Sequence, residues 1–208
     1  MNDDRALGTD GQHDNDAVAG HALIPGVIPG DWSSRLREEA TGLRSTAERR
    51  ERQGFEMTAE GRMLGALRNW YAGDGPAGKD VEELGRLAAR LGEWSGGPLQ
   101  PMHSSYLYYA RGDYLGLHRD HVSCAITLLA WLSGPAGPLY IHPELRELDE
   151  QSLHRTATHW NGHPPGGVEV DIRRGPVVLR GHVVPHDRPP HPHDEELILA
   201  TFCFALAP

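Results

Sequence analysis

The sequence predicts a mostly β fold with flanking helices, and three observations carry this prediction. Short β-branched and aromatic runs, separated by Gly and Pro, fill the chain from Met102 to residue 206, as is typical of a sandwich or barrel. Apolar residues before that point recur at helical spacing. The length of 208 residues suits one core. We therefore expect a single domain at residues 23–208, after a disordered tail at residues 1–22 that is poor in large apolar groups.

The first part of the domain, residues 31–95, is expected to support the sheet with helices. Residues 31–53 are densely charged and predict a surface helix. A second helix is predicted at residues 58–71. A third is predicted at residues 79–94, where apolar residues recur at three- and four-residue spacing: Leu84, Leu87, Ala88 and Leu91.

The sheet is expected to occupy residues 102–206. A polar segment at residues 142–167 interrupts it and is too long for a simple connection. We expect a lid-like insertion there that selects the substrate through Trp160, Arg146 or Arg155, although Trp160 could equally pack on the sheet as an anchor. The predicted strands are residues 103–110, 122–132, 139–142, 168–172, 177–180 and 196–206.

Composition argues against several classes of partner. The chain has 20 Lys+Arg against 29 Asp+Glu, a net charge of −9, and such an acidic body repels phosphate backbones. The first residues are acidic where an export signal needs basic ones. The longest apolar runs are far shorter than the roughly 20 residues that span a bilayer. The sequence therefore predicts a cytoplasmic protein that binds neither nucleic acid nor membrane, and it leaves the oligomeric state unknown.

The two cysteines of the chain, Cys124 and Cys203, lie in apolar runs that are predicted as strands. Free cysteine is among the most buried residue types, and cytosolic proteins rarely keep disulfides. We expect two reduced, buried thiols.

Histidines cluster around residue 118 and again around residue 186. His118 and Asp120 are two residues apart, so on an extended strand both side chains emerge on the same face. A second histidine from another strand would complete a set of two imidazoles and one carboxylate. Such a set leaves three positions open on iron(II), which an oxygenase needs for a bidentate cosubstrate and dioxygen. The pair alone would also fit a solvated polar turn.

The surroundings of this pair resemble a known family. Tyr109-x-x-Gly112 comes first, His118-x-Asp120 follows, and the apolar run at residues 125–132 comes next. This order resembles the prolyl-4-hydroxylase-like branch of the iron(II)/2-oxoglutarate-dependent dioxygenases. The resemblance covers about residues 102–206. It implies a double-stranded β-helix, or jelly-roll, with Fe(II) as the metal and 2-oxoglutarate as the cosubstrate.

The same resemblance implies the third metal ligand. In the family, a strand that starts with Gly leads to a loop with the last histidine, and the segment from Gly175 to His186 is similar to it. We therefore expect His118, Asp120 and His186 as the catalytic metal ligands, with His182 as the rival third ligand. His121 is interpreted as a supporting or surface imidazole. His191 and His193 are interpreted as residues of a solvated loop. The other histidines interpreted as loop residues, some of which could reach the pocket from the insertion, are His103, His142, His154, His159 and His163.

The chain departs from the family at the anchor for the far carboxylate of 2-oxoglutarate. Family members place an Arg or Lys about ten residues after the last histidine, and here Glu195, Glu196 and Leu197 occupy that place. A fixed cation is still needed for a carboxylate. We predict Arg188 for this cofactor-binding role, with Arg180 and Arg111 as further candidates and hydroxyl partners among Tyr109, Thr127 and Thr201.

The resemblance implies hydroxylation of a C–H bond, with decarboxylation of 2-oxoglutarate to succinate. Asp120 favours this reaction over halogenation, because related halogenases lack the carboxylate; desaturation and cyclisation remain open. The expected substrate is a small molecule or an amino-acid-like compound, with a peptidyl residue as the alternative. The sequence also fits a jelly-roll metalloenzyme that does not use 2-oxoglutarate, and a jelly-roll binding module without catalysis.

Overall fold

The computed structural model describes residues 20–207 of the chain. Most of the expected tail therefore lies outside the described residues. The end of that segment is part of the domain, because His21–Leu23 forms strand β1 and pairs with β11.

Strands dominate the structure, which confirms the mostly β prediction. The helices are α2 (Gly30–Leu43), α3 (Val81–Ser95) and α4 (Glu150–His159). The strands are β1 (His21–Leu23), β2 (Glu48–Arg52), β3 (Glu56–Met57), β4 (Met63–Leu64), β5 (Leu67–Gly73), β6 (Leu99–Tyr109), β7 (Tyr114–His118), β8 (Ile126–Ser133), β9 (Tyr140–Ile141), β10 (Val168–Glu169), β11 (Val177–Leu179), β12 (His186–Arg188) and β13 (Leu197–Leu206).

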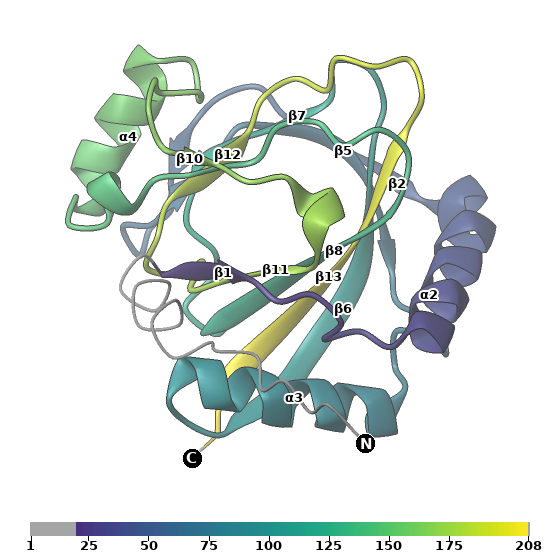
Figure 1. Ribbon diagram of the computed structural model, residues 1–208. Helices are drawn as coiled ribbons and strands as arrows, with labels where there is room; N and C mark the ends of the chain where they lie inside the picture. The colour runs from purple at the N-terminus through teal and green to yellow at the C-terminus, as the bar shows by residue number, and fades with distance from the viewer. Residues whose placement is uncertain (1–19, 208) are drawn as a thin grey trace, which may run out of the picture.

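Eleven of these strands form one sheet that curls into a jelly-roll (Figure 1). Its order is β1-β11-β8-β13-β6-β5-β7-β12-β9-β10, and β2 pairs with β5 outside this path. All pairings are antiparallel, so strands far apart in the sequence become neighbours. The curl places β7 and β12, which carry the predicted histidine ligands, opposite β8 and β13.

Helices α2 and α3 cover the outer face of the sheet (Figure 1). Their apolar faces meet the outward side chains of β6, β8 and β13 in one core, where Trp32 packs against Phe202 with ring centroids 5.4 Å apart. The Asp80 carboxylate caps α3 by accepting the Glu83 N–H. The predicted third helix is thus confirmed. Within the described residues, no helix combines the length and apolar character needed to cross a bilayer.

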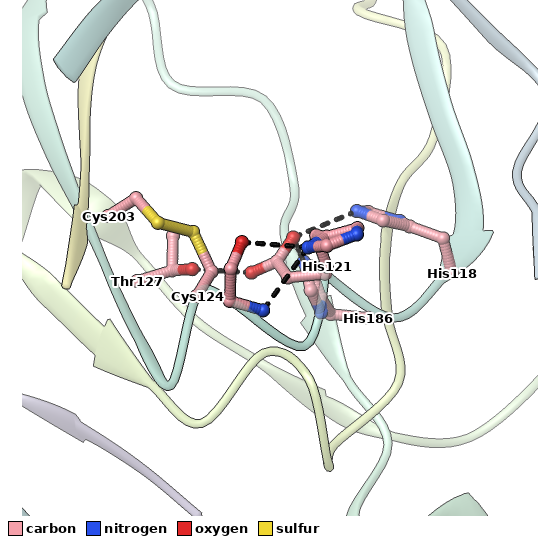
Figure 2. The surroundings of a disulfide bond; sticks show 8 residues. His118, His121, Cys124, Thr127, His186 and Cys203 are labelled. Carbon is pink, nitrogen blue, oxygen red and sulfur yellow. Dashed lines mark hydrogen bonds and ion pairs between the residues drawn. A yellow bond between two sulfur atoms is a disulfide. The ribbon is translucent and has the colours of Figure 1, made fainter. Parts of the chain in front are cut away.

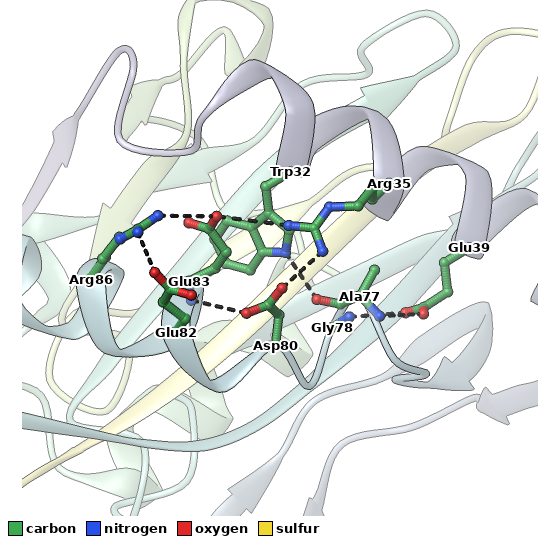
Figure 3. Close-up of polar contacts among 9 residues, drawn as sticks. All are labelled: Trp32, Arg35, Glu39, Ala77, Gly78, Asp80, Glu82, Glu83 and Arg86. Carbon is green, nitrogen blue, oxygen red and sulfur yellow. Dashed lines mark hydrogen bonds and ion pairs between the residues drawn. The ribbon is translucent and has the colours of Figure 1, made fainter.

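Polar contacts fix α2 to the loop before α3 (Figure 3). Trp32 donates from Nε1 to the Ala77 carbonyl at 2.9 Å. The Glu39 carboxylate accepts the N–H groups of Gly75, Ala77 and Gly78. These bonds satisfy backbone donors that the helical cover would otherwise bury without partners.

Two of the three predicted helices are wrong in part or whole. The first ends at Leu43, and β2 (Glu48–Arg52) follows it as a charged, exposed strand. Such charges are common on sheet edges, because they discourage pairing with other chains. The helix predicted at residues 58–71 does not form. Its second half belongs to β5, which pairs with β2, β6 and β7, and sheet pairing overrides weak helix propensity.

The insertion at residues 142–167 contains α4, which the sequence analysis missed. Leu153 and Ala157 of this helix pack against Leu117 and Met63. Arg119 secures the segment before α4 by donating to the carbonyls of residues 145, 146 and 148, and it forms an ion pair with Glu150 at 2.9 Å. Trp160 is 47% exposed, so it does not act as a packed anchor.

The prediction of two reduced thiols is wrong, although both cysteines are buried as expected. Cys124 and Cys203 form a disulfide with a Cα–Cα distance of 5.2 Å. The two residues are 79 positions apart in sequence. Cys203 lies on β13 beside β8, and the turn that leads into β8 carries Cys124. Only the sheet order brings the two residues together.

Candidate metal centre

The two predicted histidine ligands lie side by side on neighbouring strands. His118 ends β7 and pairs with His186, which begins β12. Their ring centroids are 4.2 Å apart. The Asp120 Oδ1 lies 3.5 Å from Nε2 of His118 and 3.6 Å from Nε2 of His186, the two imidazoles labelled in Figure 2. The three ligand atoms lie within 4.8 Å of one another, as a single metal ion requires.

Backbone carbonyls orient both imidazoles. Nδ1 of His118 lies 3.0 Å from the Gly116 carbonyl, and Nδ1 of His186 lies 3.1 Å from the Val184 carbonyl. A carbonyl can only accept, so Nδ1 carries the proton and Nε2 keeps its lone pair for a metal. Burial also lowers the pKa of His186 to about 4, which keeps its ring neutral near pH 7.

The Asp120 carboxylate is held in place by its neighbours. Its Oδ2 accepts the Thr127 hydroxyl at 2.5 Å, and its backbone N–H donates to the Gly181 carbonyl. Burial opposes ionisation, but the two imidazoles and this hydroxyl outweigh it and lower the pKa of Asp120 below its usual value. A Cβ at Gly181 would lie 1.8 Å from Oδ2, so only glycine leaves room for the carboxylate there.

Replacing Thr127 with valine is expected to weaken Fe(II) binding by roughly 10- to 100-fold, as loss of a group that supports a metal ligand does. Valine keeps the shape of threonine but cannot donate to Asp120. Anaerobic Fe(II) titration measures the effect. Thr201→Val is the matched control, because Thr201 lines the same cavity on β13. Equal affinities of the two variants would show that the hydroxyl of Thr127 does not support Asp120.

The three side chains open into a cavity of about 80 Å³ inside the jelly-roll. Its walls are mainly leucines from β6, β7, β8 and β13, together with Leu139. The predicted cofactor-binding residues Tyr109, Thr127 and Arg188 all line it. The Thr127 hydroxyl already donates to Asp120. Thr127 is therefore placed to hold this candidate metal ligand in position.

Arg188 brings a positive charge into this cavity. It is 2% exposed and follows His186 by two positions on β12, so both side chains face inward. Its Nη1 donates to the carbonyls of Gly137 and Pro138, and its guanidinium lies 5.3 Å from the centre of the Tyr109 ring. Within residues 20–207, Nη2 has no hydrogen-bond partner. Burial lowers the pKa of Arg188, although the neighbouring Tyr109 and Asp187 favour its charged form.

The rival candidates lie elsewhere. Arg180 contacts Ser95 and the Trp94 ring, and the exposed Arg111 pairs with Asp194 at 2.8 Å. Glu196, near the family's usual anchor position, pairs with Arg44 at 2.8 Å. Further residues that do not converge on the cavity are His182, which stays outside the cluster of possible ligands, and His121, which contacts Ser123 at the surface.

A buried cluster beside the metal centre was missed by the sequence analysis. Asp187 lies between His186 and Arg188 on β12 and also borders the cavity. Its carboxylate lies 2.6 Å from Nε2 of His142 and 2.8 Å from Nδ1 of His163. The sequence analysis interpreted both histidines as loop residues, but His142 is fully buried. No spacing pattern in the sequence indicates this cluster, because it forms only when the insertion folds back onto β12.

Comparison with known proteins identifies the fold. No family model and no curated protein matches the sequence. Among solved structures, a prolyl-4-hydroxylase of Pseudomonas putida is 15% identical with a TM-score of 0.57, covering 94% of this chain and 97% of its own. HygX of Streptomyces hygroscopicus, solved with nickel, 2-oxoglutarate and hygromycin B, is 17% identical with a TM-score of 0.64, covering 96% and 88%.

The epimerase SnoN from nogalamycin biosynthesis, described as non-haem and α-ketoglutarate-dependent, gives a similar match. It is 17% identical with a TM-score of 0.64 and covers 96% of this chain and 85% of its own. At these identities the likeness establishes the fold. The chain has the double-stranded β-helix, or jelly-roll, of the prolyl-4-hydroxylase-like iron and 2-oxoglutarate-dependent enzymes.

Proposed function

We propose that the chain is an iron(II)- and 2-oxoglutarate-dependent oxygenase that hydroxylates a C–H bond. The observation that carries this proposal is the convergence of His118, Asp120 and His186 at a cavity that also contains the buried Arg188. Two imidazoles and one carboxylate suit iron(II) and leave positions open for exogenous ligands. A binding module without catalysis has no need for three neutral or anionic donors aimed at one point.

Arg188 supports 2-oxoglutarate over a metalloenzyme that works without it. A buried guanidinium with an unpaired Nη2 is costly unless an anion completes the site. Two residues along an extended strand span about 6.8 Å, so Arg188 lies beyond His186 by a distance comparable with the length of a five-carbon dicarboxylate. The leucines that line the cavity suit the methylene groups of such a molecule.

Some residues of the cavity would bind the iron and 2-oxoglutarate, and others exclude water. His118, Asp120 and His186 would hold the iron, which with 2-oxoglutarate and dioxygen supplies a two-electron oxidation coupled to decarboxylation to succinate. Arg188 fixes the far carboxylate, and burial raises the pKa of Tyr109, so that its hydroxyl stays protonated and can donate. The leucine walls exclude water from the reacting atoms.

A small molecule is the substrate class that we favour, with a peptidyl residue as the alternative. Structures with this fold include HygX, solved with hygromycin B, and a prolyl-4-hydroxylase. The insertion that carries α4 lies beside β7, and loops over a rigid scaffold commonly set specificity. Hydroxylation is our proposed reaction, although SnoN shows that the fold also supports epimerisation. A cytoplasmic location stays a prediction.

The test is an anaerobic titration of the apo-protein with Fe(II) and then with 2-oxoglutarate. We expect the weak visible charge-transfer band of the chelated cosubstrate in the wild type and its absence in His118→Ala. Iron binding without this band would favour the metalloenzyme that does not use 2-oxoglutarate. Failure to bind iron at all would favour the binding module.

A further inference from the structure

A second group of metal-ligating side chains lies at one end of the same sheet. The ligand atoms of His103, Cys124 and Cys203 lie within 4.8 Å of one another. Strand pairing accounts for this convergence. Cys203 on β13 is opposite His103 on β6 and opposite Thr127 on β8, and residues opposite one another in a sheet share a face. Cys124 lies just before β8 and is bonded to Cys203 (Figure 2).

The donor set differs from that of the iron centre. Two sulfurs and one imidazole nitrogen are the ligands that Zn²⁺ prefers, whereas the centre at His118 offers nitrogen and oxygen. In a tetrahedral zinc site with bonds of about 2.0–2.3 Å, ligand atoms lie roughly 3.3–3.8 Å apart. The ligand atoms of the present group lie within 4.8 Å of one another. Once the S–S bond of about 2.0 Å is broken, the two sulfurs must separate by nearly 2 Å to reach that geometry.

The disulfide determines when these sulfurs can act as ligands. In the structure they are bonded to one another, and only thiolates bind zinc tightly. Reduction by a dithiol or phosphine breaks the S–S bond with two electrons and two protons and gives two thiols. Zinc then displaces both thiol protons as it binds. The sequence contains two cysteines in total, so no other thiol competes.

A metal ion can reach this group from solvent at His103. The two cysteines are buried, but His103 is exposed at the end of the sheet. Within the described part of the chain, its ring makes no hydrogen bond that a metal would have to displace. A water molecule from solvent can fill the fourth position of a tetrahedral site there.

We propose that His103, Cys124 and Cys203 form a second metal site, selective for Zn²⁺ or a similar thiophilic ion, that exists when the disulfide is reduced and is closed when it is oxidised. This site shares no ligand with the iron centre.

Cobalt(II) is the probe that distinguishes the two sites, because only thiolate ligands give an intense sulfur-to-cobalt charge-transfer band. Protein is reduced with a phosphine, freed of reductant and titrated anaerobically beside the oxidised protein. We expect two Co²⁺ ions per reduced chain, one per oxidised chain, and the band in the reduced protein alone. Zn²⁺ should displace the cobalt and abolish the band.

Variants assign the ligands. His103→Gln changes an exposed side chain, so the variant should fold. Its affinity for Co²⁺ at the thiolate site should fall by at least the roughly 10- to 100-fold that follows the loss of a residue that only supports a ligand. His118→Ala should keep the thiolate band and lose the other ion. The proposal is overturned if the reduced protein shows no band, if His103→Gln binds as tightly as the wild type, or if His118→Ala removes the band. None of these results would bear on 2-oxoglutarate binding at the iron centre.

Discussion

Replacement of Arg188 by methionine will weaken 2-oxoglutarate binding by roughly 30- to 4,000-fold. Loss of one partner of a buried, hydrogen-bonded charge pair costs about 2–5 kcal/mol, and each 1.4 kcal/mol corresponds to about tenfold in affinity. Arg188 is buried in the cavity and its Nη2 is available to a ligand. Methionine keeps much of the volume and removes the charge.

The effect should appear in the concentration of 2-oxoglutarate needed to form the visible charge-transfer band, while the affinity for Fe(II) stays close to that of the wild type. Arg180→Met is the matched control, because Arg180 is also a partly buried arginine but contacts Ser95 and Trp94 outside the cavity. If Arg180→Met lost its affinity for 2-oxoglutarate and Arg188→Met kept it, our assignment of the far-carboxylate anchor to Arg188 would be wrong.

The parts of the site that could be predicted are those that depend on local geometry. His118 and Asp120 are two residues apart, and their convergence follows from the alternation of side chains around a strand end. Arg188 and His186 have the same spacing on β12, and both line the cavity. Two side chains at this spacing on a strand face the same side in any fold, so the spacing alone could indicate these pairs.

What could not be predicted depends on which distant segments meet. The disulfide needs β8 and β13 to be neighbours, and the contact of His142 with Asp187 needs the insertion to return to β12. Strand β5 was mistaken for a helix for the same reason. Its residues are stabilised by pairing with three other strands, and no local pattern records those partners.

The cluster around Asp187 leads to the largest effect that we expect on stability. Asp187 is 1% exposed, and its carboxylate contacts the buried His142 and the partly buried His163. Burial opposes the charge on each group, but their contacts lower the pKa of Asp187 and raise that of His142. Asp187→Asn removes this carboxylate from both imidazoles, and His142 keeps only its contact with the partly exposed Glu144 at 3.0 Å. Breaking a buried pair in this way costs about 3–5 kcal/mol of unfolding free energy.

Urea unfolding of the apo-protein measures this loss, and its pH dependence tests the cause. A raised histidine pKa adds stability that is lost as pH rises through it, whereas a lowered aspartate pKa adds stability that is lost as pH falls through it. The difference between wild type and Asp187→Asn should therefore be greatest between the ordinary values of 3.8 and 6.5 and shrink at higher pH.

Asp171→Asn is the matched control for this experiment. Asp171 forms its ion pair with Arg173 at the surface, where the two side chains are 38% and 59% exposed. Exposed pairs contribute about 0–1 kcal/mol, so this variant should unfold almost as the wild type does. If Asp187→Asn were equally harmless at every pH, the cluster would be held by packing of the insertion on β12, and the charge on Asp187 would contribute little to the position of the neighbouring ligand His186.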